Sequence, residues 1–355
     1  MCNNGESSIW TNEKRVTQKR ETGNKMKIDI HTHIMPDHMP NWTQKFGYGE
    51  FIHLEHRNCQ ACMMKGDKLF RVVEENCYKE DIRIKEMDET GVTMQVLSTI
   101  PVLFNYWANS ADGFETSRFF NDHIAETVSK NPKRFTGLGT VPLQDVDLAI
   151  KEMERCIKEL KMPGVEIGSN INGENLSEKK FFPFYEAAEK LGCALFVHPW
   201  EMMGEDKMQK YWLPWLVGMP AETSRAICSM IFGSVFEQFP KLRIAFAHGG
   251  GSFPFTLGRI EHGFDVRPDL VAVDNANNPK DYIGKFWVDS LVHDKKTMEF
   301  LIEAMGEDSI CLGSDYPFPL GEQYPGKLIE KMKLDKKITK KLLYKNAEAW
   351  LGIER

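Results

Sequence analysis

The chain has 355 residues, of which 42% are hydrophobic and 27% are charged, and its formal net charge is −6 at pH 7. These values are typical of a globular protein, and the length allows one barrel-sized domain or two ordinary domains. The small acidic excess provides no basic field, so nucleic acid is not an expected partner. No run of about 18 apolar residues occurs, so we expect no transmembrane helix and no membrane partner.

Residues 1–25 are polar, carry both acids and bases, and lack the apolar segment of a secretory signal. Their composition only weakly resembles a transit peptide. We therefore predict a disordered extension over 1–25 and one folded domain over 26–355. The eight cysteines are scattered, which favours reduced thiols over a disulfide framework. Cys59 and Cys62 have the spacing of half a zinc knuckle, but no second pair follows, so a loop with two thiols is the simpler interpretation.

The stretch from Met26 to Ile34 reads M-K-I-D-I-H-T-H-I, and its alternation of apolar and polar residues predicts a strand. Side chains two apart in a strand share a face, so His31 and His33 project together. Such a pair could bind one metal ion. Taken alone, the pair also fits a less favoured alternative, two polar histidines at an exposed edge.

Residues 35–80 follow without a clean helical period, but they are rich in aromatic side chains. We predict an insertion that folds over one end of the domain and contains a short strand at Lys68–Val73. Long insertions of this kind often carry function.

A regular alternation of strands and helices occupies the rest of the chain. It predicts a (β/α)₈ TIM-type barrel, with a doubly wound sheet as the alternative. The predicted strands are 26–34, 92–99, 135–143, 164–171, 194–200, 242–250, 286–292 and 310–317. The predicted helices are 81–90, 116–130, 146–161, 181–191, 221–239, 295–305 and 335–350.

Metal-binding residue types stand at the carboxyl ends of four predicted strands: His31 with His33, His198, His248 and Asp315. Barrel enzymes assemble their sites at that end, although a single such histidine is more often a core residue. Three imidazoles and a carboxylate suit Zn²⁺ with a bound water, whose pKa the ion would lower towards about 7. The additional imidazole, His248, would best serve as the base for that water.

Other classes of function remain open at this point. One is a metal-dependent hydrolase such as a lactonase or amidase, and another is a non-catalytic protein stabilised by zinc. The H-G-G-G segment at 248–251 also resembles the oxyanion loop of some esterases, but the chain contains no G-x-S-x-G nucleophile motif.

Several segments together resemble the amidohydrolase superfamily: D-I-H-T-H (29–33), F-V-H-P-W (196–200), F-A-H-G-G-G (246–251), L-G-S-D-Y-P-F (312–318) and N-A-E-A-W-L-G (346–352). More narrowly, F-G-Y-G (46–49), F-R-V-V-E-E-N-C (70–77), residues 210–223 and H-G-F-D-V-R-P-D-L (262–270) are similar to its metal-dependent decarboxylase branch. The resemblance runs from Met26 to the C-terminus.

The resemblance implies decarboxylation of a small acyclic dicarboxylate in tryptophan catabolism, in the cytosol, by a homodimer with one zinc ion per subunit. One metal is expected because the fourth strand, V-E-I-G-S at 165–169, lacks the lysine of two-metal relatives. Arg71 would bind substrate, and Arg267 would reach the site of the neighbouring subunit, although either could be a surface salt bridge. The implied ligands are His31, His33, His198 and Asp315, with His248 as the base and Lys65, Trp215 and Phe318 as further pocket residues.

Overall fold

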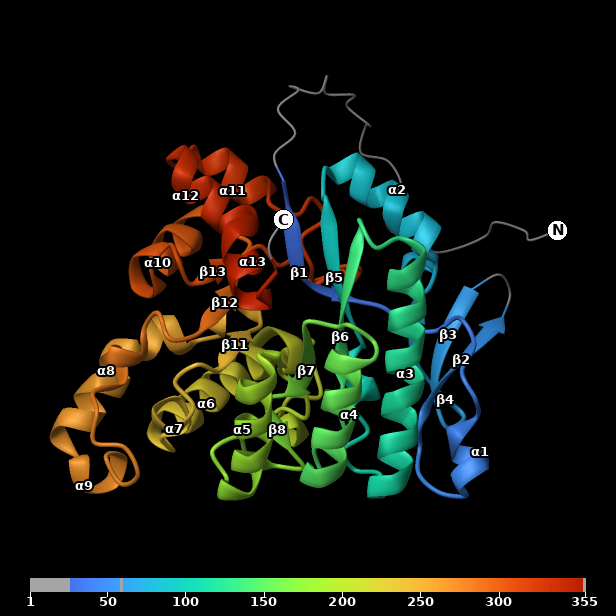
Figure 1. Ribbon diagram of the computed structural model, residues 1–355, viewed down its shortest axis with the longest axis horizontal. Coiled ribbons are helices and arrows are strands. Elements are labelled where there is room, and N and C mark those ends of the chain that lie inside the picture. Colours follow the sequence, from blue (N-terminus) through green and yellow to red (C-terminus); the bar gives the residue numbers. More distant parts are fainter. Residues whose placement is uncertain (1–25, 58–59, 354–355) are drawn as a thin grey trace.

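The computed structural model describes residues 26–57 and 60–353. The predicted extension 1–25 and Cys59 lie outside the described residues. Eight parallel strands form one sheet in the order β1-β5-β6-β7-β10-β11-β12-β13 (Figure 1). Their bounds are β1 Ile28–His33, β5 Met94–Ser98, β6 Phe135–Thr140, β7 Gly164–Gly168, β10 Ala194–His198, β11 Arg243–Phe246, β12 Trp287–Asp289 and β13 Ile310–Cys311.

The first strand and the segment that begins at β13 close the sheet into a barrel. The Ile30 amide donates to the Leu312 carbonyl at 2.9 Å, and the His33 amide donates to the Tyr316 carbonyl at 2.8 Å. An open doubly wound sheet would leave these two edges unpaired. The predicted (β/α)₈ barrel is therefore confirmed, and the doubly wound alternative is wrong.

Helices cover the outside of the barrel at the places where the sequence predicts them, with shifted ends. The predicted helix at 116–130 begins earlier, at Ser110, and the one at 221–239 is divided in two. The predicted helix at 335–350 contains a π-helical turn over Lys341–Lys345. The matching helices are α2 Glu80–Thr90, α3 Ser110–Lys130, α4 Val146–Lys158, α5 Phe182–Leu191, α6 Met219–Phe232, α7 Val235–Gln238, α10 Lys295–Met305, α12 Lys336–Lys340 and α13 Asn346–Leu351.

Helix α8 (Phe253–Val266) was not predicted, and it extends with α9 (Pro268–Val271) away from the barrel (Figure 1). Pro254, Gly258 and Gly263 obscure its helical pattern. Pro254 lies in the first turn, where its missing N–H costs no hydrogen bond. Phe253 is fully buried and fixes the start of the helix on the barrel. Helices α1 (Trp42–Phe46) and α11 (Lys327–Met332) were also missed.

The barrel interior beneath the histidines is apolar. The Phe196 ring lies 5.0 Å from the His31 ring on one side and 5.9 Å from the Trp350 ring on the other, measured between centroids. All three side chains are fully buried. Trp350, from α13, thus closes the lower end of the barrel, and Phe196 provides a dry floor for the histidines above it.

The insertion forms a three-stranded antiparallel sheet of β2 (Ile52–Arg57), β3 (Gln60–Lys65) and β4 (Lys68–Val73). The predicted strand Lys68–Val73 is confirmed, whereas β2 and β3 were not predicted. Ile52, Met63 and Val73 pack on Ile100 from the loop after β5, together with Phe318. The sheet is thereby attached beside the carboxyl ends of the barrel strands, and it carries Arg71 to that end.

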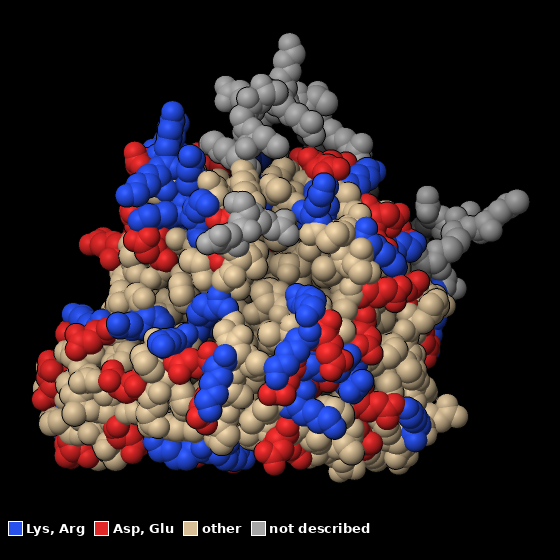
Figure 2. Space-filling view, viewed as in Figure 1, with Lys and Arg blue, Asp and Glu red and all other residues tan. Residues whose placement is uncertain are grey.

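The surface carries both signs of charge, interspersed over the face shown in Figure 2. No helix among the described residues has the length and apolar character needed to cross a membrane. Six cysteines within the described part of the chain, Cys62, Cys77, Cys156, Cys193, Cys228 and Cys311, are free thiols, as predicted.

Candidate active site

Four ligand-type side chains meet at the carboxyl ends of β1 and β10 and in the loop after β13. One donor atom from each of His31, His33, His198 and Asp315 lies within 4.8 Å of the others. The parallel strands bring these residues together although up to 284 positions separate them in the chain (315 − 31 = 284). Within the described residues this is the one group of histidine, cysteine and acidic side chains with such a spacing.

Hydrogen bonds at the Nδ1 atoms determine which nitrogens of the three rings face the cluster. His33 Nδ1 lies 2.8 Å from the Thr99 carbonyl, and His198 Nδ1 lies 3.0 Å from the Pro199 carbonyl. His31 Nδ1 lies 2.6 Å from Asp289 Oδ2. Because these partners can only accept, each imidazole in its neutral form carries its proton on Nδ1 and presents an unprotonated Nε2.

The donor set fits a divalent cation. His31 Nε2 and His33 Nε2 lie 3.2 Å apart, and two lone pairs facing each other at that distance repel unless a cation lies near them. His198 Nε2 is buried and has no hydrogen-bond partner among the described residues. Burial, together with the nearby His248 and His31 rings, lowers the pKa of His198 well below its usual value, so the ring is neutral and can act as a ligand.

Asp315 supplies the carboxylate of the cluster. Its Oδ1 lies 3.2 Å from His33 Nε2 and 3.5 Å from His31 Nε2. Burial opposes ionisation, but His248 and the two β1 histidines hold the pKa of Asp315 well below its usual range. The backbone of Asp315 has φ of 57°, a left-handed conformation, and Tyr316 after it pairs with Thr32 of β1. The predicted strand 310–317 is shorter in the structure, where β13 covers only Ile310–Cys311.

His248 lies beside the cluster but outside the group of four. Its ring centroid is 5.1 Å from that of His31 and 5.0 Å from that of His198, and its Nε2 is 3.8 Å from Asp315 Oδ2. The residue follows β11 in a tight turn and has φ of 57°. An imidazole so placed can exchange a proton with a small molecule held at the cluster.

Asp289, at the end of β12, is a site residue that the sequence analysis missed. It is fully buried, and its carboxylate accepts hydrogen bonds from the His31 ring and from the backbone of His248 and Gly249. The same signal that identified the other residues, an acid after an apolar strand, could have found it. The predicted strand 286–292 runs past Asp289, whereas β12 ends at this residue, so Asp289 was not recognised as standing at a strand end.

Two further buried acids lie near the histidines without joining the group of four. Asp29 accepts hydrogen bonds from the Ser314 amide and hydroxyl and from the His31 amide, and burial raises its pKa to about 7. Glu166, on the fourth barrel strand, lies 3.8 Å from His33 Nδ1, and burial raises its pKa to about 8. Both carboxyl groups are therefore largely neutral at moderately acidic pH.

A narrow cavity opens beside the cluster and contains several of the predicted pocket residues. His33, His198 and Asp315 line its floor, and Arg71, Trp215 and Phe318 line its walls. The Arg71 guanidinium lies 5.0 Å from the centroid of the Phe318 ring and 5.7 Å from that of Trp215. Within the described chain, Arg71 forms no salt bridge with a carboxylate, so its charge is available to an anionic ligand.

Two predicted residues lie outside this cavity. Lys65 lines a neighbouring one, where it faces Glu201. Arg267 lies between α8 and α9, pairs with Asp269 at 2.8 Å, and is exposed. Neither residue contacts the cluster within this subunit.

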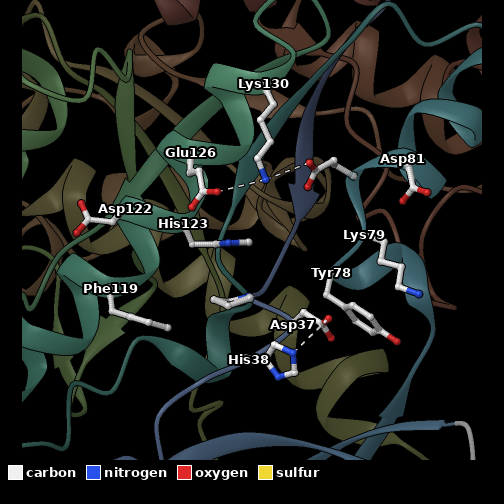
Figure 3. Close-up of a pocket in the computed structure, with 12 residues that line it drawn as sticks. Asp37, His38, Tyr78, Lys79, Asp81, Phe119, Asp122, His123, Glu126 and Lys130 are labelled. Atoms are coloured by element: carbon white, nitrogen blue, oxygen red, sulfur yellow. Dashed lines mark ion pairs between the residues drawn. The ribbon is translucent and has the colours of Figure 1, made fainter.

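A larger cavity of about 570 Å³ lies elsewhere, between the loop after β1, the start of α2 and helix α3 (Figure 3). Lys130 pairs there with Glu80 and Glu126, and His123 and Asp37 also line it. None of the four ligand-type residues does so. Its lining has more carboxylates than ammonium groups, and the chemistry described above lies in the other cavity.

The chain belongs to the amidohydrolase family, whose model matches residues 28–353. It is 56% identical to the 2-amino-3-carboxymuconate-6-semialdehyde decarboxylase of Dictyostelium discoideum, over 93% of this chain and 92% of that relative. It is 39% identical to the Caenorhabditis elegans protein of the same name, over 94% of this chain and 96% of that one. The predicted class, a decarboxylase of this family, is confirmed.

A solved structure supports the fold. The dihydroxybenzoic acid decarboxylase of Polaromonas sp. JS666 aligns with a TM-score of 0.75 and 22% identity, over 93% of this chain and 98% of that chain. That protein was solved with bound manganese and the inhibitor 2-nitroresorcinol.

Proposed function

We propose that this protein catalyses the non-oxidative decarboxylation of 2-amino-3-carboxymuconate-6-semialdehyde to 2-aminomuconate-6-semialdehyde. The observation that carries the proposal is the arrangement of one cavity, in which a histidine–aspartate cluster lies beside an arginine without a carboxylate partner. The named relatives supply the identity of the substrate. We propose that the reaction takes place in the cytosol as part of tryptophan catabolism, where it would limit quinolinate formation.

The proposed metal ligands are His31, His33, His198 and Asp315, and we propose one Zn²⁺ per subunit. Neutral imidazoles suit zinc, and the single carboxylate completes a mixed donor set. When bound, such an ion supplies a Lewis acid that makes a water molecule acidic near neutral pH.

The side chains around the cluster would then perform the remaining chemistry. His248 would accept at Nε2 the proton of the water whose hydroxyl adds to the amino-bearing carbon of the substrate double bond, while a proton from solvent adds to the neighbouring carbon. This neighbouring carbon carries the departing carboxylate. Once it is saturated, the electrons of its bond to the carboxylate can form the double bond again and expel the hydroxyl as CO₂ leaves. His248 would return its proton to that hydroxyl, which departs as water, and one proton is consumed overall.

Arg71 would hold a substrate carboxylate. A guanidinium pairs with a carboxylate through two parallel hydrogen bonds, and the adjacent Trp215 and Phe318 rings restrict its orientation. The positive charge of the Arg71 guanidinium would also offset the negative charge of the dicarboxylate substrate in a partly dry cavity. Lys65 would act at longer range, from the neighbouring cavity.

The direct test is to incubate the zinc-loaded protein with freshly prepared 2-amino-3-carboxymuconate-6-semialdehyde. We expect substrate absorbance to decay with release of one CO₂ per molecule consumed, and a chelator should stop both. A hydrolase of the same family would leave the carbon count of the substrate intact. Consumption of substrate without CO₂ would therefore contradict the proposal.

We further propose a homodimer in which Arg267 serves the site of the partner. Arg267 does not line the cavity of its own subunit, and exposed apolar side chains surround it. Val266, Leu270 and Val273 are 55%, 62% and 70% exposed, respectively. Apolar surface of this kind on a projecting helix is typical of a protein interface.

Mixing two inactive variants tests the shared site. In a heterodimer of Arg71→Ala with Arg267→Ala chains, one of the two sites would contain both arginines. Isolated heterodimers should therefore recover about half of the wild-type activity per dimer, because a two-fold dimer contains two equivalent sites. Each variant alone should remain inactive. Heterodimers as inactive as the parent variants would contradict the shared site.

A further inference from the structure

One buried carboxylate joins the metal-type cluster to the turn that carries His248. Asp289 Oδ2 lies 2.6 Å from His31 Nδ1 and 2.8 Å from the His248 amide nitrogen. Its Oδ1 accepts from the amides of Gly249 at 2.7 Å and Leu291 at 3.0 Å. All four acceptor positions of this carboxylate are thus occupied, and the side chain is fully buried.

The turn that Asp289 holds has an unusual backbone. His248, Gly249, Gly250 and Gly251 have φ of 57°, 62°, 76° and 63°, respectively, so four consecutive residues are left-handed. Such a segment costs energy wherever a side chain is present, as it is at His248. The backbone amides of His248 and Gly249 donate hydrogen bonds to the Asp289 carboxylate. These charge-assisted hydrogen bonds stabilise the conformation that places the His248 ring beside the cluster.

A glycine at position 313 leaves the space that the contact between Asp289 and His31 needs. A Cβ atom built on Gly313 would lie 2.6 Å from Asp289 Cβ and 3.0 Å from His31 Cβ. Only glycine fits between these two side chains. The contact between Asp289 and His31 is therefore built by β1, β12 and the start of the loop after β13 together.

We propose that Asp289 is a positioning residue that fixes the distance between the metal ligand His31 and the base His248. It does so by accepting hydrogen bonds from both through one oxygen atom. The inference rests on the proposed function, because it assigns His31 and His248 their roles there. Histidine ligands elsewhere are oriented by carboxylates in the same way, but here the carboxylate also holds the base.

The test is Asp289→Asn, with Asp29→Asn as the matched control. An asparagine must turn its NH₂ group either toward His31 and His248 or toward Gly249 and Leu291, and all four partners are donors. The first orientation moves the His31 proton to Nε2 and removes a ligand lone pair, whereas the second releases the turn. Asp29 is equally buried and also accepts from the His31 amide, but it contacts no side chain of the cluster.

Zinc affinity is measured by competition with a chromophoric chelator, and kcat and KM are measured at saturating zinc. Asp289→Asn should bind zinc about 10- to 100-fold more weakly than wild type. With zinc saturating, kcat should fall about 100-fold while KM changes little, because the base is misplaced by about 1 Å. Asp29→Asn should lower the melting temperature but bind zinc within a few-fold of wild type.

A purely structural role for Asp289 predicts that both variants lose stability and keep zinc affinity, and that result would overturn the inference. If Asp289→Asn does not fold, zinc-loaded wild-type protein labelled with ¹⁵N-histidine provides the test. The His31 Nδ1 proton should be shifted downfield and protected from exchange, and a rapidly exchanging proton would contradict the assignment. Absence of CO₂ release by the wild-type protein would instead contradict the proposed function.

Discussion

His248→Ala is expected to retain zinc and to lose turnover by about 10²- to 10⁴-fold, the usual contribution of a general acid–base group. The centroid of the His248 ring lies 5.1 Å from that of His31 and 5.0 Å from that of His198. His248 is not among the four side chains whose donor atoms converge. Its removal should therefore leave the metal donor set intact. Zinc content by atomic emission and kcat in the decarboxylase assay are the two measurements.

A second substitution separates proton transfer from packing at this position. His248→Gln keeps a polar side chain of similar reach but cannot accept a proton near neutral pH. It should be as inactive as His248→Ala. Loss of zinc from either variant would make His248 a ligand instead of a base, and retention of wild-type turnover would remove it from the mechanism.

His198→Ala is expected to lose zinc, and with it all decarboxylation above background. His198 Nε2 is a buried nitrogen without a hydrogen-bond partner among the described residues, and a metal ion is the partner that its neutral, low-pKa ring suits. Removing it takes one of four donors from the cluster. The affinity for zinc should fall by more than the roughly 10- to 100-fold that is typical of losing an outer partner.

His53→Ala is the control for this experiment. His53 is also a histidine on a strand, but it pairs with Glu55 in the small sheet of the insertion and lies outside the cluster. Its zinc affinity should match that of wild type in the same chelator titration. If His198→Ala bound zinc as tightly as His53→Ala, the proposed ligand set would be wrong.

The barrel and the cluster could be predicted for the same physical reason. An apolar strand that ends in a histidine or aspartate is a local sequence pattern. Closure of a parallel sheet into a barrel brings the carboxyl ends of all its strands to one rim. His31, His198 and Asp315 were found in this way and lie together in the structure. The pattern failed for Asp289 because the predicted strand 286–292 continues past it, whereas β12 ends there.

Other features depend on contacts that a sequence pattern does not contain. Helix α8 was missed because its glycines and proline suggest a loop, and the burial of Phe253 against the barrel is what stabilises it. The strands β2 and β3 were missed, and they are held in the small sheet by pairing of β2 with β3 and of β3 with β4. Arg71 and Arg267 were identified through resemblance alone, because an isolated arginine on a strand or in a loop does not indicate a substrate contact.

Anomalous diffraction at the zinc edge, from crystals of the zinc-loaded protein, tests the central claim most directly. The account predicts one anomalous peak per subunit, bonded to His31, His33, His198 and Asp315, with His248 nearby but not coordinated. Two peaks at the barrel mouth, or a single peak that lacks His198 or Asp315, would contradict it.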